Sequence, residues 1–434
     1  MDDPRRHRKQ RLPSTKEKSY NKGGSIPHQG KEETTMPKLS ERAQRMPASP
    51  IRRLVPYADA AKARGVKVYH LNIGQPDIET PQCARDAVRQ AEVSVVSYSN
   101  SAGNLSFREG LVKYYAKVGV SLQASDMIVT TGGSEAITMA LAACMNPGDE
   151  VIIPEPFYAN YNGFAEQNGV KVVAVPSDIR HNFALPPMEE FEKRITPRTK
   201  AIMVCNPNNP TGYLYTEAEV RQLGEIAKKH DLYLLADEVY REFCYDGHRH
   251  HSVMSLRGME DYTILLDSVS KRYSLCGARV GVLATRNKAL LAAMMKFAQA
   301  RLCPPFYGQI AAEAALNAPE SYFKAVYNEY IARRDYMVNA LNEIPGVFSP
   351  MPHGAFYTVV ELPVDDADRF AKWLLEEYSY QGQTVMVAPA SGFYSTLGFG
   401  TREARLAYVL KLEDLKKAME VLRHALEEYP GRIR

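Results

Sequence analysis

The sequence lacks the cysteine patterns that predict a disulfide framework or a metal site. Six cysteines are spread through 434 residues with no C-x-x-C pair: Cys83, Cys144, Cys205, Cys244, Cys276 and Cys303. Isolated thiols of this kind are typical of proteins in the reducing cytoplasm. We therefore expect a cytoplasmic protein, and we predict no metal site.

Long hydrophobic runs are also missing. The longest uncharged stretch, residues 378–401, holds four glycines and a proline among its polar residues. A membrane helix needs about 20 predominantly apolar residues, so this stretch cannot form one. We expect no membrane partner.

Most of the chain has no excess of either positive or negative charge. Residues 1–35 contain nine basic and five acidic side chains, which accounts for the whole net charge of +4. The remainder is electrically balanced, so a nucleic-acid partner is not indicated. Residues 1–35 are polar and have little to bury, and we interpret them as a disordered basic extension.

Apolar strand-like runs alternate with helical patterns from about residue 125 to residue 285. Continuously apolar strands separated by helices are typical of a parallel sheet that is covered on both faces. The pattern predicts an α/β domain over residues 81–319 with a mostly parallel sheet of seven strands: 127–131, 150–154, 170–175, 201–205, 233–237, 263–267 and 280–284.

The pattern changes after about residue 319. A long helical stretch leads to a predicted strand at 354–362, a helix at 368–378, a strand at 404–410 and a last helix from about Leu412. This order is typical of an α+β arrangement. We predict a smaller domain formed by residues 36–80 and 320–434.

Polar clusters follow several of the predicted strands, where open α/β sheets bind their ligands. The stretch GGSEAI (132–137) starts a helix, whose first N–H groups could hold an anion. NPNNPTG (206–212) is rich in turn residues, Asp237 ends an apolar strand, and Lys271 lies between two apolar runs. Each cluster alone fits a capped helix or an ordinary loop, but four of them at successive strand ends indicate a site.

These segments resemble the class I/II pyridoxal-phosphate-dependent aminotransferases of fold type I, from about Met36 to the C-terminus. Ser268 and Lys271 match the S-x-x-K of that family, with Arg279 eight residues after the lysine. NPNNPTG resembles its N-P-x-N-P-T-G, DEVY (237–240) its D-E-x-Y, and EPFYANY (155–161) its P-x-Y-x-x-Y. The resemblance implies pyridoxal 5′-phosphate as the cofactor.

The resemblance also implies a role for each matching residue. Lys271 would form a Schiff base with the cofactor and then act as the general base, with its pKa lowered by burial and by Arg279. Asp237 would pair with the ring nitrogen. The remaining implied contacts are Asn209 and Tyr240 with the phenolic oxygen and Tyr158 with the ring face.

The phosphate and the substrate have implied partners as well. The N–H groups around Gly133, Ser134 and Glu135, the hydroxyls of Ser268 and Ser270, and Arg279 would hold the phosphate. Tyr98 would reach it from the other subunit of a homodimer with shared active sites. Arg405 would bind the substrate α-carboxylate, with Gly74 and Asn209 beside it.

The implied reaction moves an amino group between an L-amino acid and a 2-oxo acid such as 2-oxoglutarate. An aspartate-like donor is favoured by family frequency alone, and no motif identifies a residue for its second carboxylate. A carbon–sulfur β-lyase on the same scaffold is the alternative. Two departures, Arg272 after the lysine and the small Ala278, bear on the pocket's shape rather than on the reaction.

Overall fold

The structure is a computed structural model, and it describes residues 37–433. The predicted extension, residues 1–35, lies outside this range. Residues from Glu41 onward form one compact unit. Among residues 37–433, no helix combines the length and the apolar character needed to cross a membrane. The cytoplasmic location expected from the sequence stays a prediction.

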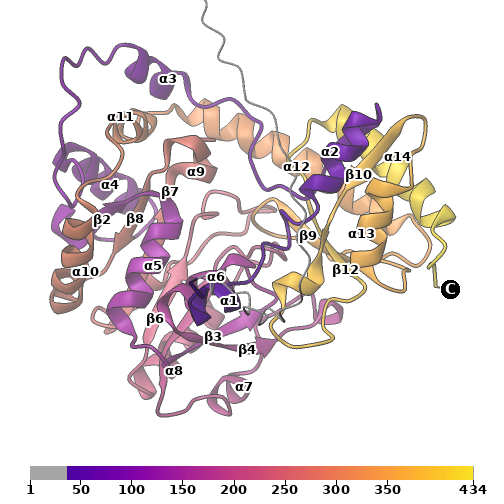
Figure 1. Ribbon diagram of the computed structural model, residues 1–434. Coiled ribbons are helices and arrows are strands. Elements are labelled where there is room, and N and C mark those ends of the chain that lie inside the picture. The colour runs from indigo at the N-terminus through magenta and orange to yellow at the C-terminus, as the bar shows by residue number, and fades with distance from the viewer. Residues whose placement is uncertain (1–36, 434) are drawn as a thin grey trace, which may run out of the picture. The chain divides into compact units, whose positions relative to one another are not determined.

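The centre of this unit is a seven-stranded sheet (Figure 1), and all seven predicted strands are confirmed. Its order is β2-β8-β7-β6-β5-β3-β4, and β8 runs in the opposite direction to the other six strands. The strands are β2 (Met127–Thr130), β3 (Glu150–Glu155), β4 (Lys171–Pro176), β5 (Thr199–Cys205), β6 (Tyr233–Asp237), β7 (Thr263–Ser268) and β8 (Gly281–Ala284).

Helices cover both faces of this sheet, which explains why its strands are almost continuously apolar. Leu235 packs in the core that includes α5 (Gly132–Cys144) and α10 (Lys288–Arg301). Its neighbours Leu234 and Ala236 point the other way, into a core with α8 (Glu217–Lys229). Consecutive residues of a strand face opposite sides, so one apolar run serves two cores.

Helix α8 shows how closely local sequence specifies these layers. The hydroxyl of Thr216 accepts a hydrogen bond from Glu219 N, and the Glu219 carboxylate accepts one from Thr216 N, which together form a capping box. Its apolar residues Val220, Leu223, Ile226 and Ala227 recur at helical spacing and are buried. A polar cap at the start and an apolar stripe are sufficient to specify the helix.

Two smaller sheets lie in the same unit. Strand β1 (Lys67–His70) pairs in parallel with β10 (Gln383–Met386), and β9 (Tyr357–Glu361) pairs with β12 (Glu403–Ala407), which also contacts β11 (Ala388–Pro389). The predicted strands near 354–362 and 404–410 are confirmed, whereas β1 and β10 were not predicted. The division into two domains stays a prediction.

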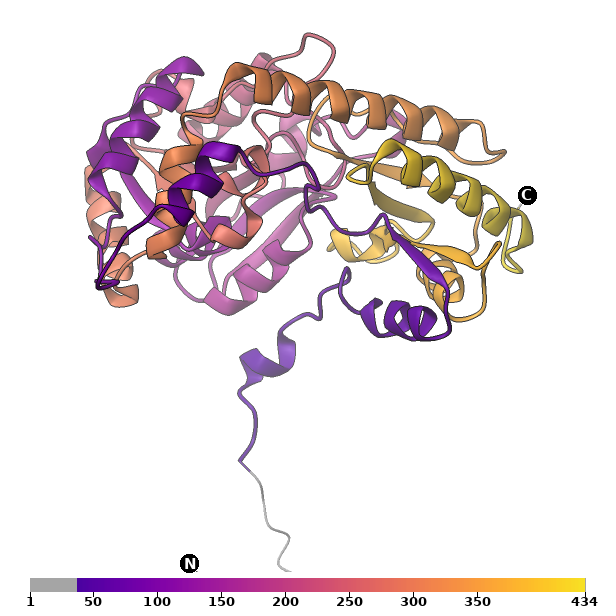
Figure 2. The ribbon, with the colours of Figure 1, turned by 90° about the horizontal axis from the view of Figure 1, so that it is seen from above.

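Four helices accompany these sheets: α2 (Val55–Ala63), α12 (Glu320–Asn342), α13 (Ala367–Glu376) and α14 (Leu412–Glu428). Figure 2 shows α12 running beside α14. The other α-helices are α1 (Glu41–Arg45), α3 (Gln82–Arg89), α4 (Leu105–Lys117), α6 (Asn160–Asn168), α7 (Met188–Glu192), α9 (Val269–Arg272) and α11 (Phe306–Ala315). Short 3₁₀ turns span Ala124–Asp126, Ile179–His181, Val253–Ser255, Cys276–Ala278 and Ala390–Phe393.

Candidate active site

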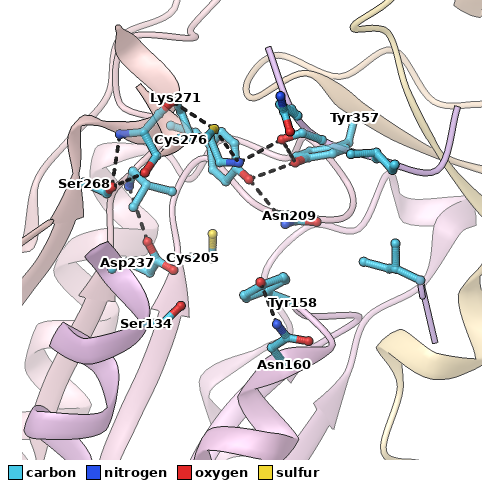
Figure 3. Close-up of a pocket in the computed structure, with 18 of the residues that line it drawn as sticks. Ser134, Tyr158, Asn160, Cys205, Asn209, Asp237, Ser268, Lys271, Cys276 and Tyr357 are labelled. Carbon is cyan, nitrogen blue, oxygen red and sulfur yellow. Dashed lines mark hydrogen bonds between the residues drawn. The ribbon is translucent and has the colours of Figure 1, made fainter. Parts of the chain in front are cut away.

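A cavity of about 740 Å³ opens beyond the carboxyl ends of β5, β6 and β7 (Figure 3). The start of α5, the segments around residues 49–55 and 72–75, and side chains from β9 and β12 complete its wall. Twelve of the fourteen predicted site residues line it: Gly74, Gly133, Ser134, Tyr158, Asn209, Asp237, Tyr240, Ser268, Ser270, Lys271, Arg279 and Arg405.

Lys271 reaches into this cavity from the short helix α9, which follows β7 directly. Ser268 caps α9 by accepting a hydrogen bond from Ser270 N. The Lys271 amine donates to the carbonyl oxygen of Gly74 at 2.8 Å. Burial lowers the pKa of Lys271, and the guanidinium groups of Arg405 and Arg279 act in the same direction. A buried amine with a lowered pKa is suited to accept a proton.

Asp237 ends β6, and its carboxylate lines the cavity and is hydrogen-bonded to two neighbouring groups. Its carboxylate accepts hydrogen bonds from the Tyr161 hydroxyl at 2.8 Å and from Val239 N at 3.4 Å. Burial raises the pKa of Asp237 to about 6. Such a carboxylate gains from a cationic or hydrogen-bonding partner inside the cavity.

A chain of polar contacts joins the two sides of the cavity. The Asn209 amide donates to the Tyr240 hydroxyl at 3.4 Å, and the hydroxyls of Tyr240 and Tyr357 are 3.0 Å apart. Tyr357 belongs to β9 and lines the cavity, although it was not among the site residues predicted from the sequence. Its contact with Tyr240 joins segments 117 positions apart, which no spacing rule could have predicted.

Arg405 extends from β12 and is buried. Its guanidinium donates to Asn209 Oδ1 at 3.1 Å and to the backbone carbonyl of Asn72. Its Nε is buried and has no partner among the described residues. An arginine with an unused N–H at a cavity wall is well suited to hold a carboxylate.

An anion-binding cradle lies at the start of α5. The residues Gly133 and Ser134 are in its first turn, where backbone N–H groups have no partner within the helix. The guanidinium of Arg279 lies over Gly132, so close that a Cβ at Gly132 would be 2.4 Å from Arg279 Nη2. The hydroxyls of Ser268 and Ser270, 2.7 Å apart, also line the cavity. Together with the helix dipole, these donors favour a phosphate-like anion.

Tyr158 follows β3 and lies on the opposite wall from Lys271 in Figure 3. Its hydroxyl accepts a hydrogen bond from the Asn160 amide at 2.8 Å. Its ring packs edge-on against Tyr161, with 5.4 Å between the ring centroids. The ring orientation is therefore fixed from two directions.

Two predicted residues do not line the cavity. The carboxylate of Glu135 is turned to the start of α5, where it accepts a hydrogen bond from Thr131 N at 2.6 Å and pairs with Arg301 at 3.3 Å. Tyr98 is 79% exposed. The predicted phosphate contacts of both residues stay predictions.

The fold matches that of fold type I aminotransferases. A solved structure of alanine aminotransferase from Pyrococcus furiosus superposes with a TM-score of 0.83 at 32% identity, covering 90% of this chain and 100% of that one. A family model described as aminotransferase class I and II matches residues 66–422. The chain belongs to that family.

Curated relatives agree with this assignment. The aspartate aminotransferase of Bacillus subtilis is 31% identical over 402 residues, which is 90% of this chain and 100% of that protein. The aromatic-amino-acid aminotransferase 2 of Thermococcus litoralis is 31% identical over 398 residues, 90% of this chain and 98% of that protein. This chain is therefore an aminotransferase, and the β-lyase alternative is not favoured. The family generally depends on pyridoxal phosphate, acts on amino acids and 2-oxo acids, and is dimeric.

Proposed function

We propose that this aminotransferase binds pyridoxal 5′-phosphate in the cavity described above, with Lys271 as the residue that attaches it and then acts as the general base. The observation that carries this proposal is that a partly buried lysine and a buried aspartate, Lys271 and Asp237, line the same cavity. The cofactor supplies an electron-withdrawing ring that stabilises negative charge on the substrate Cα.

The donor set fits the chemical groups of this cofactor. Asp237 holds the proton on the ring nitrogen, because a buried carboxylate whose pKa is raised is stabilised by a cation beside it. Asn209 and Tyr240 donate to the phenolic oxygen. Tyr158, fixed by Asn160 and Tyr161, covers the ring face.

The donors at the start of α5 bind the phosphate group of the cofactor. Its ligands are the first-turn N–H groups of Gly133, Ser134 and Glu135, together with the hydroxyls of Ser268 and Ser270 and the guanidinium of Arg279. This mixture of N–H groups, hydroxyls and a forked cation is the donor set that phosphates prefer in proteins. In support, the Arg279 guanidinium lies over the helix start, where glycine leaves it room.

The substrate is held by Arg405, which binds the α-carboxylate through its guanidinium, with Asn209 and the Gly74 backbone beside it. The Lys271 amine then takes the proton from the substrate Cα. Its lowered pKa supports this role, because a neutral amine is needed to accept that proton. The donor is an L-amino acid, with an aspartate-like one favoured, and the acceptor is a 2-oxo acid such as 2-oxoglutarate.

The test is the visible absorbance of the purified protein after incubation with pyridoxal phosphate. We expect a visible band that disappears when a single amino acid is added and returns when 2-oxoglutarate is added. The Lys271→Ala variant should show neither change. Its matched control is Lys288→Ala, which removes a lysine outside the cavity that pairs with Asp126. A protein that takes up no cofactor contradicts the proposal.

The same proposal includes a homodimer, in which the partner subunit's Tyr98 reaches the phosphate. It is supported by apolar side chains beside Tyr98 that are exposed in the single chain, Val95 by 69% and Val96 by 55%. Burial of such a patch is typical of subunit interfaces. We expect a dimer by light scattering, and Tyr98→Phe should weaken cofactor affinity without changing the mass. A monomeric active protein contradicts this part.

A further inference from the structure

Arg52 is a cation on the wall of the active-site cavity that the roles above leave unused. Of the residues that the structure describes, four basic ones line this cavity, Arg52, Lys271, Arg279 and Arg405, and one acidic residue, Asp237. Within residues 37–433, no ion pair or side-chain hydrogen bond engages the guanidinium of Arg52. The neighbouring Arg53 differs, because it pairs with Asp368 of α13.

The turn that carries Arg52 is well anchored. Pro50 packs closely against Gly392. A Cβ added at Gly392 would lie 2.3 Å from the Cβ of Pro50. Ile51 packs on the apolar cluster that includes Phe393. The backbone N–H groups of Arg52 and Arg53 both donate to Ser49 O, at 3.1 and 3.0 Å. The guanidinium of Arg52 therefore extends from a fixed backbone.

Arg52 and the proposed α-carboxylate ligand, Arg405, both line the cavity that also includes Tyr158. Burial raises the pKa of the Tyr158 phenol, and the positive charges of Arg405 and Arg52 both oppose that rise. Two guanidinium groups thus lie near one tyrosine, one buried and already hydrogen-bonded, the other exposed and unpaired. Two cations that line one cavity, both near Tyr158, match a ligand with two carboxylates.

We propose that Arg52 binds the distal carboxylate of a dicarboxylic amino acid, while Arg405 binds its α-carboxylate. This inference rests on the proposed function, and it narrows the substrate to aspartate, glutamate and their 2-oxo acids. Arginine suits the task because its planar fork can hold a carboxylate through two parallel hydrogen bonds. A substrate with an uncharged side chain leaves Arg52 in water, at little cost.

The first experiment compares kcat/KM of the cofactor-loaded enzyme for aspartate, glutamate and alanine. Loss of one charge-assisted contact should lower kcat/KM of Arg52→Gln about 10- to 100-fold for both dicarboxylic substrates. The value for alanine should change by no more than about twofold, which is within the usual effect of a surface substitution. Arg52→Lys should recover part of the loss, because it restores the charge without the fork.

The matched control is Arg53→Gln, which removes the same charge from the adjacent position but outside the cavity. It breaks the pair with Asp368 and so tests whether loosening of this turn alone alters specificity. We expect the ratio of the aspartate and alanine values to stay at its wild-type level.

The second experiment measures binding without reaction. Titration calorimetry of the cofactor-loaded enzyme with succinate, an unreactive dicarboxylate, should show weaker binding to Arg52→Gln by a similar factor. Binding of propionate, which has one carboxylate, should be unchanged in the same variant.

The outcomes separate this inference from the function on which it rests. Equal losses for alanine and aspartate, or the same change of specificity in Arg53→Gln, would mean that Arg52 only holds the turn, and would overturn the inference. Unchanged specificity and succinate binding in Arg52→Gln overturn it while the aminotransferase proposal stands. A wild-type protein that takes up no cofactor overturns both.

Discussion

Asp267 and Arg272 form a buried ion pair that spans the segment carrying Lys271. The same Asp267 oxygen is 3.2 Å from the guanidinium of Arg241, the residue that follows Tyr240, and it accepts a hydrogen bond from Tyr115 at 2.7 Å. One carboxylate therefore ties together the segments that present Lys271 and Tyr240. Arg272, a departure from the family pattern, does not line the cavity, and neither does Ala278.

Loss of this ion pair should destabilise the fold. Replacing Arg272 by Met leaves Asp267 buried with one cation instead of two, and we expect a loss of about 3 kcal/mol in the free energy of unfolding. Denaturant unfolding at pH 7 measures it. Arg221→Gln is the control, because Arg221 pairs with Glu217 on the exposed face of α8 and should cost less than about 1 kcal/mol. Equal stabilities of the two variants would contradict the prediction.

The ionisation of Asp267 should also affect how the free energy of unfolding depends on pH below about pH 4. Burial alone would raise the pKa of Asp267, but the charges of Arg272 and Arg241 outweigh burial and hold it at about 2. Because this pKa is below that of an unfolded aspartate, about 3.9, the stabilisation is complete above pH 4 and is lost as the pH falls toward 2. In Arg272→Met the pKa of Asp267 should rise toward that of an unfolded aspartate, so acidification should remove less stability than in the wild type. Identical acid limbs for wild type and variant would refute this explanation.

Asp237 should have the opposite effect on stability. Its pKa is raised to about 6 by burial, so in the cofactor-free protein its ionisation costs stability as the pH rises from about 4 to about 6. We expect Asp237→Asn to be more stable than wild type at pH 8, by about 3 kcal/mol at 1.36 kcal/mol per pKa unit, and equally stable at pH 4. Unfolding of the cofactor-free proteins across this range measures the difference.

The cofactor-loaded Asp237→Asn variant provides the second half of that test. Its transaminase activity should fall, because the partner of the ring nitrogen is lost. A gain in stability together with a loss of activity is the expected trade-off of a residue kept for function. Parallel stability curves for the two cofactor-free proteins would show that Asp237 is not titrating as described.

Substitution of Arg405 should lower the activity toward every amino-acid substrate by a similar factor. Arg405→Lys keeps the charge but cannot offer two parallel hydrogen bonds, so kcat/KM should fall about 10- to 100-fold for alanine and aspartate by similar factors. This pattern differs from that of Arg52→Gln, which should spare alanine. An Arg405→Lys enzyme that keeps its alanine kcat/KM would exclude the assigned α-carboxylate role.

The large sheet could be predicted from the sequence because its strands are buried on both faces. Strands such as β6 are therefore apolar at consecutive positions, and the polar residues at their ends, among them Asp237, stand out. Short motifs then indicate most of the cavity wall. By contrast, β1 is a four-residue strand with only Tyr69 buried, and β10 lies in an uncharged glycine-containing stretch, so neither carries a clear period.

The remaining features depend on contacts between distant segments, which spacing cannot reveal. The hydroxyl groups of Tyr240 and Tyr357 are in contact although the residues are 117 positions apart in the sequence. Arg241 donates a hydrogen bond to Asp267, which is 26 positions away. Arg52 belongs to a turn near the start of the described chain, and the packing of Pro50 on Gly392 and of Ile51 on the cluster with Phe393 holds that turn at the cavity. Arg52 and Arg53 are adjacent in the sequence, which does not indicate which of the two lines the cavity.

Gly74 combines several of these contacts, which makes it the sharpest test of the site's geometry. A Cβ at Gly74 would lie 1.6 Å from the Tyr357 hydroxyl oxygen, and the Gly74 carbonyl accepts the hydrogen bond from Lys271. Gly74→Ala must therefore displace Tyr357 or its own backbone, and with it Lys271 or Tyr240. A displacement of about 1 Å at a reacting group can lower kcat/KM about 100-fold, and we expect a loss of that order.

Two further variants show whether that loss comes from this clash. Gly277→Ala is the control, because a Cβ there meets nothing within 4 Å, and its activity should match wild type. Tyr357→Ala removes the side chain that the new methyl group would strike. If the clash is the cause, adding Gly74→Ala to Tyr357→Ala should cost much less than it costs in the wild type, because the two substitutions act through one contact. Additive losses would instead mean that Gly74 is required for backbone conformation alone.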